Sequence, residues 1–144
     1  MGLLRIARTP LVTVLMQTTV MEAVRTMDQE SIGAVAVIDG SVLVGMFSER
    51  DLMRRVVSEK RDPEQTTIRE VMTSPVATIR RDSTADEALK VMLEKHIRHL
   101  PIVDRDGKLA GMISMRSLLN DKVEDLTGQL DSLEAYFTAD GFGG

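Results

Sequence analysis

Two short segments of the chain share a serine that is followed three residues later by an acid or a second hydroxyl. Residues 45–51 read GMFSERD and residues 111–117 read GMISMRS. Ser48 can donate its hydroxyl to a phosphate or a ribose, and Asp51 can accept both hydroxyls of a ribose. The free N–H groups of a helix N-terminus favour anions beside them. In the second segment Ser117 replaces the acid, so the two copies are not chemically equal.

The same residues can be explained without a ligand. Ser48, Glu49 and Asp51 all suit the first turn of a helix, where hydroxyls and carboxylates satisfy free N–H groups. Taken alone, these residues favour helix capping over ligand binding. The choice between the two roles therefore depends on the rest of the chain.

The segment HIRH at 96–99 raises the separate question of a metal or catalytic site. His96 and His99 precede an apolar run that we predict to be a strand, where they would lie on opposite faces. The chain has no cysteine and no third histidine, so zinc would need carboxylates for its other ligands. No nucleophile–base pair surrounds them. We predict no metal site and no catalytic residue, and we expect a basic patch that is compatible with phosphate contact.

Composition limits the partners and the compartment. The 144 residues are 43% hydrophobic, with a formal net charge of −4 and an isoelectric point near 5.2. An acidic chain of this kind is not typical of general nucleic-acid binders, which need a basic face. The N-terminus has no secretory signal pattern, and no apolar run approaches the roughly 18 residues that span a bilayer. We expect a cytoplasmic protein without nucleic-acid or membrane partners and without disulfides.

An internal duplication organises the chain. Residues 9–27 align with residues 74–92 at an offset of 65, with proline, threonine, glutamate, alanine and methionine in matching places. After one inserted residue the offset becomes 66, which aligns the two serine segments. Two copies are too few for a solenoid, so we predict a pair of units related by a local twofold axis.

Each copy is predicted to fold in the order β-α-β-β-α. The first copy would have strands at 11–15, 34–38 and 42–47, and helices that begin after Thr19 and near Arg50. The second would have strands at 76–80, 100–103 and 109–114, and helices that begin after Thr84 and near Arg116. Glu22 and Glu87 stand three residues after the two threonines, which is the spacing of a capping box. Asp39-Gly40 and Asp106-Gly107 are typical of hairpin turns.

The predicted architecture is an α/β (α+β) fold in which the two sheets pack face to face and leave clefts at the seam. The predicted boundaries are 1–57 for the first repeat with its N-terminal segment, 58–70 for a polar linker, 71–120 for the second repeat and 121–144 for a C-terminal helix and tail.

These motifs resemble a tandem pair of CBS domains, the Bateman module, over about residues 9–120. The resemblance is carried by GAVAVID followed by GMFSERDLMRRV, by MTSP, and by KHIRHLPIVD followed by GKLAGMIS. It implies a regulatory ligand sensor that binds adenine nucleotides such as AMP, ADP or ATP, and sometimes NAD or S-adenosylmethionine. It implies no catalysis and no required cofactor, and CBS pairs commonly form homodimers.

The resemblance also implies two sets of ligand-binding residues. In the first site Asp51 would hold the ribose, Ser48 and Arg50 would lie near the phosphate and Met46 beside the base. The other repeat would add Val76 and Ala77 at the adenine edge and Arg98 and His99 at the phosphates. The second site would use Leu11, Val12, Ser114, Arg116 and Ser117. Because Ser117 lacks a carboxylate, and Gly33 stands where a cation could have been, we expect weak or no binding there.

The tail carries a heptad pattern. Leu119, Val123, Leu126, Leu130, Leu133 and Phe137 are spaced 4, 3, 4, 3 and 4 residues apart. Such a stripe either packs on its own module or pairs with another helix, and we favour self-association. Gly128 lies inside the stripe region and weakens the helix.

The sequence thus predicts a non-enzymatic sensor in which a nucleotide shifts the arrangement of the two repeats. A protein-interaction or dimerisation scaffold without a ligand is the first alternative. A module that binds NAD(H) or S-adenosylmethionine is the second.

Overall fold

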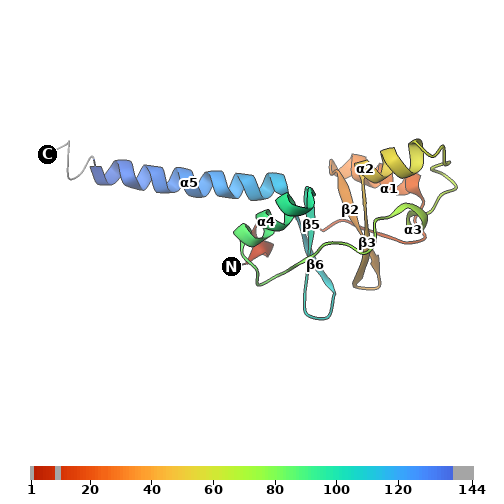
Figure 1. Cartoon of the computed structure of the whole chain (residues 1–144), viewed down its shortest axis with the longest axis horizontal. Helices are drawn as coiled ribbons and strands as arrows, with labels where there is room; N and C mark the ends of the chain where they lie inside the picture. Colours follow the sequence, from red (N-terminus) through yellow and green to blue (C-terminus); the bar gives the residue numbers. More distant parts are fainter. Residues whose placement is uncertain (1, 9–10, 138–144) are drawn as a thin grey trace.

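The computed structural model describes residues 2–8 and 11–137, with side chains up to residue 135. The first repeat contains β1 (Thr13–Leu15), α1 (Val20–Glu30), β2 (Ala34–Asp39), β3 (Val42–Ser48), α2 (Glu49–Asp51) and the π-helical turn η2 (Leu52–Val57). The second contains β4 (Ile79–Arg80), α4 (Ala85–Lys95), β5 (His99–Val103), β6 (Leu109–Ser114) and α5 (Met115–Phe137). Two short helices, η1 (Leu3–Arg5) and α3 (Ile68–Val71), precede the repeats (Figure 1).

Each repeat has a three-stranded sheet of the same topology. The first strand pairs in parallel with the second, and the second pairs antiparallel with the third. Both hairpins shift register at matching places, and each turn holds a glycine at positive φ, Gly40 or Gly107. The predicted order β-α-β-β-α is confirmed in both copies. The opening strands are shorter than predicted, because Leu11 and Val76 pack between the sheets instead of pairing.

The helix caps agree only in part with the prediction. Thr19 forms a complete capping box, in which its hydroxyl accepts from the Glu22 N–H and the Glu22 carboxylate accepts from the Thr19 N–H. Thr84 accepts from the Glu87 N–H, but the return bond is missing among the described residues. His96 ends α4 in the left-handed conformation, so it is a helix C-cap at the entrance to β5.

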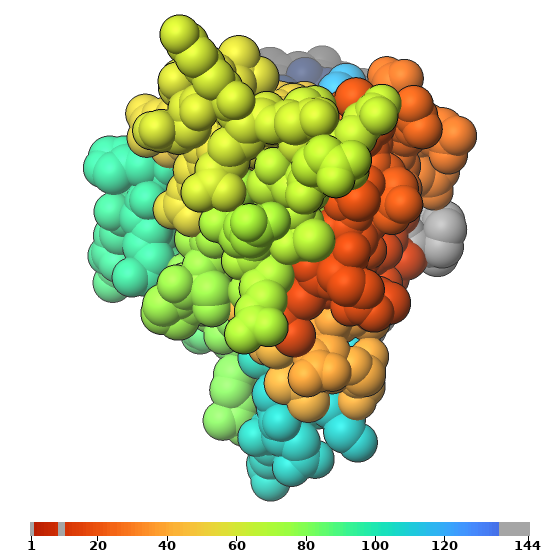
Figure 2. All heavy atoms as spheres, turned by 90° about the vertical axis from the view of Figure 1, so that its right-hand side faces the viewer, coloured from red at the N-terminus to blue at the C-terminus, as the bar shows by residue number. Residues whose placement is uncertain are grey.

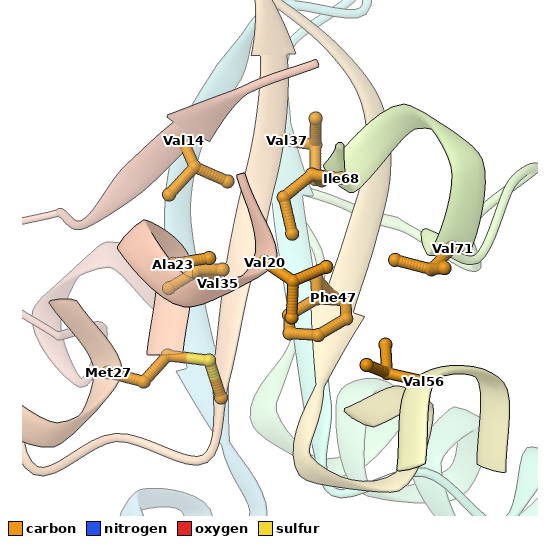
Figure 3. Packing of buried hydrophobic residues seen from close by; sticks show 10 residues of the cluster. All are labelled: Val14, Val20, Ala23, Met27, Val35, Val37, Phe47, Val56, Ile68 and Val71. Carbon is orange, nitrogen blue, oxygen red and sulfur yellow. The ribbon is translucent and has the colours of Figure 1, made fainter. Parts of the chain in front are cut away.

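The core of the first repeat lies between its sheet and the helices that cover it (Figure 3). Phe47 on β3 is its largest member and is fully buried beside Val20 of α1 and Val56 of η2. Burying such a side chain contributes about 2–3 kcal/mol relative to exposure. The cluster also includes Ile68 and Val71 of α3. Residues from outside the repeat therefore complete its core.

The segment 58–70, predicted as a polar linker, has a structural role. Thr66 and Ile68 are buried, and α3 begins inside this segment. The Val20 N–H donates to the Thr66 carbonyl at 2.9 Å, and the Ile68 N–H donates to the Thr18 carbonyl at 2.8 Å. Figure 2 shows the yellow-green segment lying against the red-orange residues of the first repeat.

The segment before the first repeat packs on the second repeat in the same way. Leu3 of η1 is 1% exposed and belongs to the second core with Leu100 and Ile113. The two serine segments begin with glycines because these packed segments come so close. A Cβ at Gly45 would lie 2.6 Å from the Met72 Sδ, and one at Gly111 would lie 2.9 Å from a Leu4 methyl group.

The two repeats join through their sheets. A third core cluster combines Ala34, Ala36 and Met46 of the first repeat with Met112 of the second. At the hairpin tips the Leu43 N–H donates to the Gly107 carbonyl and the Leu109 N–H donates to the Ser41 carbonyl. These tips, orange and cyan, lie side by side at the bottom of Figure 2. The face-to-face packing of the sheets is thus confirmed.

Helix α5 projects away from both repeats (Figure 1). Its first turns are held by an ion pair between Arg5 and Asp121 at 2.8 Å and by another between Lys122 and Asp86. Its apolar stripe is not covered by its own module, since its members are 47–60% exposed: Leu119, Val123, Leu126, Leu130 and Leu133. None of the described helices is both long enough and apolar enough to cross a membrane.

Candidate functional site

Asp51 is the central residue of the predicted first site. Its side chain is buried, with the residue only 7% exposed, at the point where β3 turns into α2. The Asp51 Oδ2 accepts from the Ser48 N–H at 3.0 Å and from the Ser48 hydroxyl at 3.2 Å. In return the Asp51 N–H donates to the Ser48 hydroxyl at 3.4 Å. The capping role that the segment suggests is therefore present in the unliganded fold.

The other carboxylate oxygen of Asp51 is held from outside the serine segment. The Thr73 hydroxyl donates to Oδ1 at 2.9 Å, and the Arg55 Nε lies 3.6 Å from the same oxygen. Neither Thr73 nor Arg55 was among the site residues predicted from the sequence. Thr73 stands in the quoted MTSP motif, but its contact with Asp51 joins residues 22 positions apart. Arg55 stands four residues after Asp51 on the same helical segment, a spacing that would have suggested the ion pair.

Three hydrogen bonds and the Arg55 ion pair together occupy the carboxylate, whose two oxygens offer about four lone-pair positions. A ribose hydroxyl would have to replace one of the present donors. The Ser48 hydroxyl is the easiest to replace, since its rotation would free it to donate elsewhere. The arrangement can therefore exchange a Ser48–Asp51 contact for a ribose–Asp51 contact and a Ser48–phosphate contact.

Arg98 and His99 lie at the start of β5 in the other repeat. Burial lowers the pKa of His99 below its ordinary value, while nearby Glu49 raises it and Arg98 lowers it further. Glu49 begins α2, directly before Arg50 and Asp51, and its charge acts on His99 of the other repeat.

A hollow of about 410 Å³ lies next to this basic pair. It is lined by Arg98, His99, Ser114, Met115, Arg116, Leu119, Asn120 and Val123. From the sequence, Arg98 and His99 were predicted for the first site, and Ser114 and Arg116 for the second. The sheet explains their meeting, because His99 is paired with Ser114 across β5 and β6. The hollow also reaches the base of the α5 stripe.

The remaining first-site residues lie in three environments. Met46 is buried in the cluster between the sheets, and Val76 packs against the same cluster. Ala77 packs instead against the second core, and Arg50 is exposed at the first turn of α2. Met46 and Val76 are therefore near each other, whereas Ala77 points to a different cluster.

The predicted second site has the same capping geometry without the charge. The Ser114 hydroxyl donates to the Ser117 hydroxyl at 3.0 Å, and the Ser117 N–H donates to the Ser114 hydroxyl at 3.1 Å. Leu11 packs in the cluster between the sheets, while Val12 packs on the first core. Arg116 is exposed. Ser117 thus keeps the helix start but offers no carboxylate.

Across residues 2–8 and 11–137, histidine, cysteine, aspartate and glutamate do not gather in any group of three or more that could hold an ion. His96 and His99 are separated by the end of α4 and the start of β5.

The family-profile match and the similar proteins point to the same protein family. A sequence profile described as CBS domain matches residues 4–58 and 68–124. An uncharacterized protein from Methanopyrus kandleri is 36% identical over 115 residues, a match that covers 79% of this chain and 59% of the relative. This chain therefore spans about three fifths of that relative's length.

Solved structures show the same architecture. A protein with CBS domains from Burkholderia ambifaria superposes with a TM-score of 0.79 at 32% identity, and the match covers 87% of this chain and 96% of that one. CBSX2, solved in complex with AMP, superposes with a TM-score of 0.70 at 25% identity, covering 82% of this chain and 91% of that one.

Proposed function

Since this chain belongs to the CBS-domain family, we propose that its first cleft binds an adenine nucleotide and that binding regulates the module. The observation that carries the proposal is the buried Asp51 carboxylate at a helix start, two residues after Glu49, whose charge acts on His99 of the other repeat. A carboxylate can accept the hydroxyls of a ribose, and Arg98 next to His99 offers a cation for the phosphate of a nucleotide.

The ligand class has independent support. CBSX2, which shares this fold at 25% identity, was solved in complex with AMP. In this chain Met46 and Val76 offer an apolar surface between the sheets for the base. NAD(H) and S-adenosylmethionine contain the same adenosine group, so they remain alternative ligands of the same cleft.

The mechanism is a population shift rather than a reaction. A nucleotide that contacts Asp51 in one repeat and Arg98 in the other binds best to one relative arrangement of the two repeats. Because the basic pair shares its hollow with the base of α5, that arrangement is transmitted to the helix. We propose no chemical step at this cleft.

A thermal-shift panel of AMP, ADP, ATP, NAD, NADH and S-adenosylmethionine tests the proposal. A ligand at a hundred times its dissociation constant stabilises the fold by about 2.7 kcal/mol. Asp51→Asn keeps a hydrogen-bonding cap but removes the charge, so we expect the ligand-induced shift to disappear while the fold persists. Ser117→Ala is the matched control and should leave the shift unchanged. If no compound raises the melting temperature, the sensor function is wrong.

A second function is favoured by the exposed stripe of α5. Five apolar side chains at heptad spacing lie uncovered along a helix that projects from the module. We propose that a second copy of the chain covers them, which makes the protein a homodimer. If the nucleotide panel is negative and this dimer forms, the ligand-free scaffold is the better description.

A further inference from the structure

Arg8 occupies in the second cleft the position that Thr73 occupies in the first. The two residues are 65 positions apart, the offset that aligns the repeats. Their backbones make the same contact, since the Thr73 N–H donates to the Met46 carbonyl at 2.7 Å and the Arg8 N–H donates to the Met112 carbonyl at 2.9 Å. Each of these residues therefore lies beside the third strand of one sheet, close to the serine turn that follows that strand.

The side chains at these equivalent places behave differently. Thr73 is short and donates its hydroxyl to Asp51 within the first cleft. Arg8 is long, and its Nη2 donates to the Glu30 carbonyl at 3.1 Å, with the Glu30 carboxylate 3.9 Å away. Glu30 ends α1 of the first repeat. Arg8 therefore starts on the sheet of the second repeat and crosses the seam to the first.

This crossing leaves one donor atom of Arg8 without a partner. The Arg8 Nε is buried and makes no hydrogen bond among the described residues. In the first cleft the equivalent of Ser117 is the charged Asp51, which accepts from Thr73. Ser117 is neutral and its hydroxyl already accepts from Ser114. Compared with the first site, the second therefore has a serine in place of the carboxylate and an arginine, bound to Glu30 of the other repeat, in place of the threonine.

We propose that Arg8 and Ser117 together close the second cleft to nucleotides, so that each chain has one working cleft. The proposal rests on the function proposed above, and it adds the residues that decide where a nucleotide binds. Arg8, held two residues before the serine turn by its contact with Met112, sends its side chain across to Glu30, and Ser117 leaves the ribose without a charged acceptor. Changing either residue alone is insufficient, because an aspartate at position 117 would pair with Arg8 and a threonine at position 8 would face a neutral serine.

The test converts the second cleft into a copy of the first. Isothermal titration with the nucleotide that performs best in the thermal panel counts the sites per chain for the wild type, Arg8→Thr, Ser117→Asp and the double variant. We expect one site in the wild type and in each single variant, and two in the double variant. A thermal melt of each unliganded variant verifies that it is folded.

The outcomes separate this inference from the function of the first cleft. Two sites in the wild type, or one site in a folded double variant, would overturn the closure of the second cleft. No site in the wild type with one in the double variant would support the closure and reject the first-cleft proposal. No binding in any variant would reject both.

A reciprocal variant gives a second, independent readout. Thr73→Arg introduces a guanidinium beside Asp51 and should abolish nucleotide binding in the first cleft although Asp51 is intact. Thr73→Ser keeps a hydroxyl at the same place and should bind with less than a threefold loss of affinity. Unchanged binding by Thr73→Arg would contradict the role assigned to Arg8.

Discussion

Asp51 fixes the start of a helix and the path of a distant loop with one carboxylate. It accepts from the Ser48 backbone and hydroxyl and from the Thr73 hydroxyl. Capping by a side chain of this type is worth about 1 kcal/mol. In the proposed function Asp51 would hold the ribose, and the cap already fixes the position of its carboxylate. The same position of the Asp51 carboxylate therefore suits both a helix cap and the proposed ribose contact.

His99 makes the stability of the unliganded protein sensitive to pH. Burial lowers its pKa in the folded chain, so the unfolded chain binds more protons once the pH falls below about 6.5, the ordinary value for histidine. We expect the free energy of unfolding to fall as the pH drops from 7.5 to 5.5, and His99→Gln to reduce that loss. Urea titrations at several pH values measure it.

The control for this prediction is the other histidine. His96 lies at the exposed end of α4 in the left-handed conformation, which asparagine tolerates. His96→Asn should therefore keep the pH dependence of the wild type. If His99→Gln and the wild type lose stability in parallel, the desolvation of His99 does not contribute.

At the scale of secondary-structure elements, substitution of two glycines by alanine should have opposite effects on stability. A Cβ at Gly45 would lie 2.6 Å from the Met72 Sδ and 3.0 Å from the Thr73 carbonyl oxygen, so the strand and the crossing segment would have to separate. Gly45→Ala should destabilise the fold by about 1–3 kcal/mol. Gly128 in α5 has no atom within 4 Å, and Gly128→Ala should stabilise the helix by about 1 kcal/mol.

Chemical denaturation of Gly45→Ala and Gly128→Ala measures the expected loss and the expected gain of stability, with the same glycine-to-alanine change in both variants. The midpoint should fall for the strand variant. For the α5 variant, the gain should appear in far-ultraviolet circular dichroism as greater helix content, because α5 projects from the core. A fall of equal size in both variants would indicate a general cost of losing glycine rather than a close approach.

The α5 stripe predicts the oligomeric state. Leu126 and Leu130 lie at its middle and are more than half exposed. Leu126→Glu with Leu130→Glu should convert a dimer to a monomer without changing the melting temperature of the module, because neither side chain packs on it. Light scattering after gel filtration measures the mass.

Ser132→Glu adds a charge to the same helix away from the stripe and is the matched control for the dimer. It should remain dimeric. A wild type that is monomeric at all concentrations, or a dimer that survives both glutamates, would exclude pairing through this surface. In the second case the contact would lie on the repeats themselves.

The elements also show what a single sequence could predict. The duplication, the hairpins and the Thr19 cap follow from local patterns, because each depends on residues close together in the chain. The packing of Ile68 on the first core, and of Leu3 on the second, joins residues that local patterns do not relate. The same limit hid Thr73 and Arg8, whose roles depend on contacts 22 positions apart.

At the scale of the whole molecule, the two repeats are interlocked rather than merely adjacent. The segment before the first repeat completes the core of the second, and the segment between the repeats completes the core of the first. The hairpin tips share hydrogen bonds, and Arg8 reaches from one repeat to the other. Each repeat therefore depends on residues that are held in place by the other repeat, and we expect the two repeats to unfold together.

Leu3→Ala tests this cooperativity. Leu3 is 1% exposed in the second core, so its truncation should cost about 2–5 kcal/mol. Because the repeats are interlocked, the loss should be equal in hydrogen-exchange protection at Val35 in the first sheet and at Leu100 in the second. Leu133→Ala, at an exposed position, should leave both unchanged. A loss confined to Leu100 would show that the repeats unfold independently, and a ligand bridging them could then act by ordering one repeat rather than by moving a rigid pair.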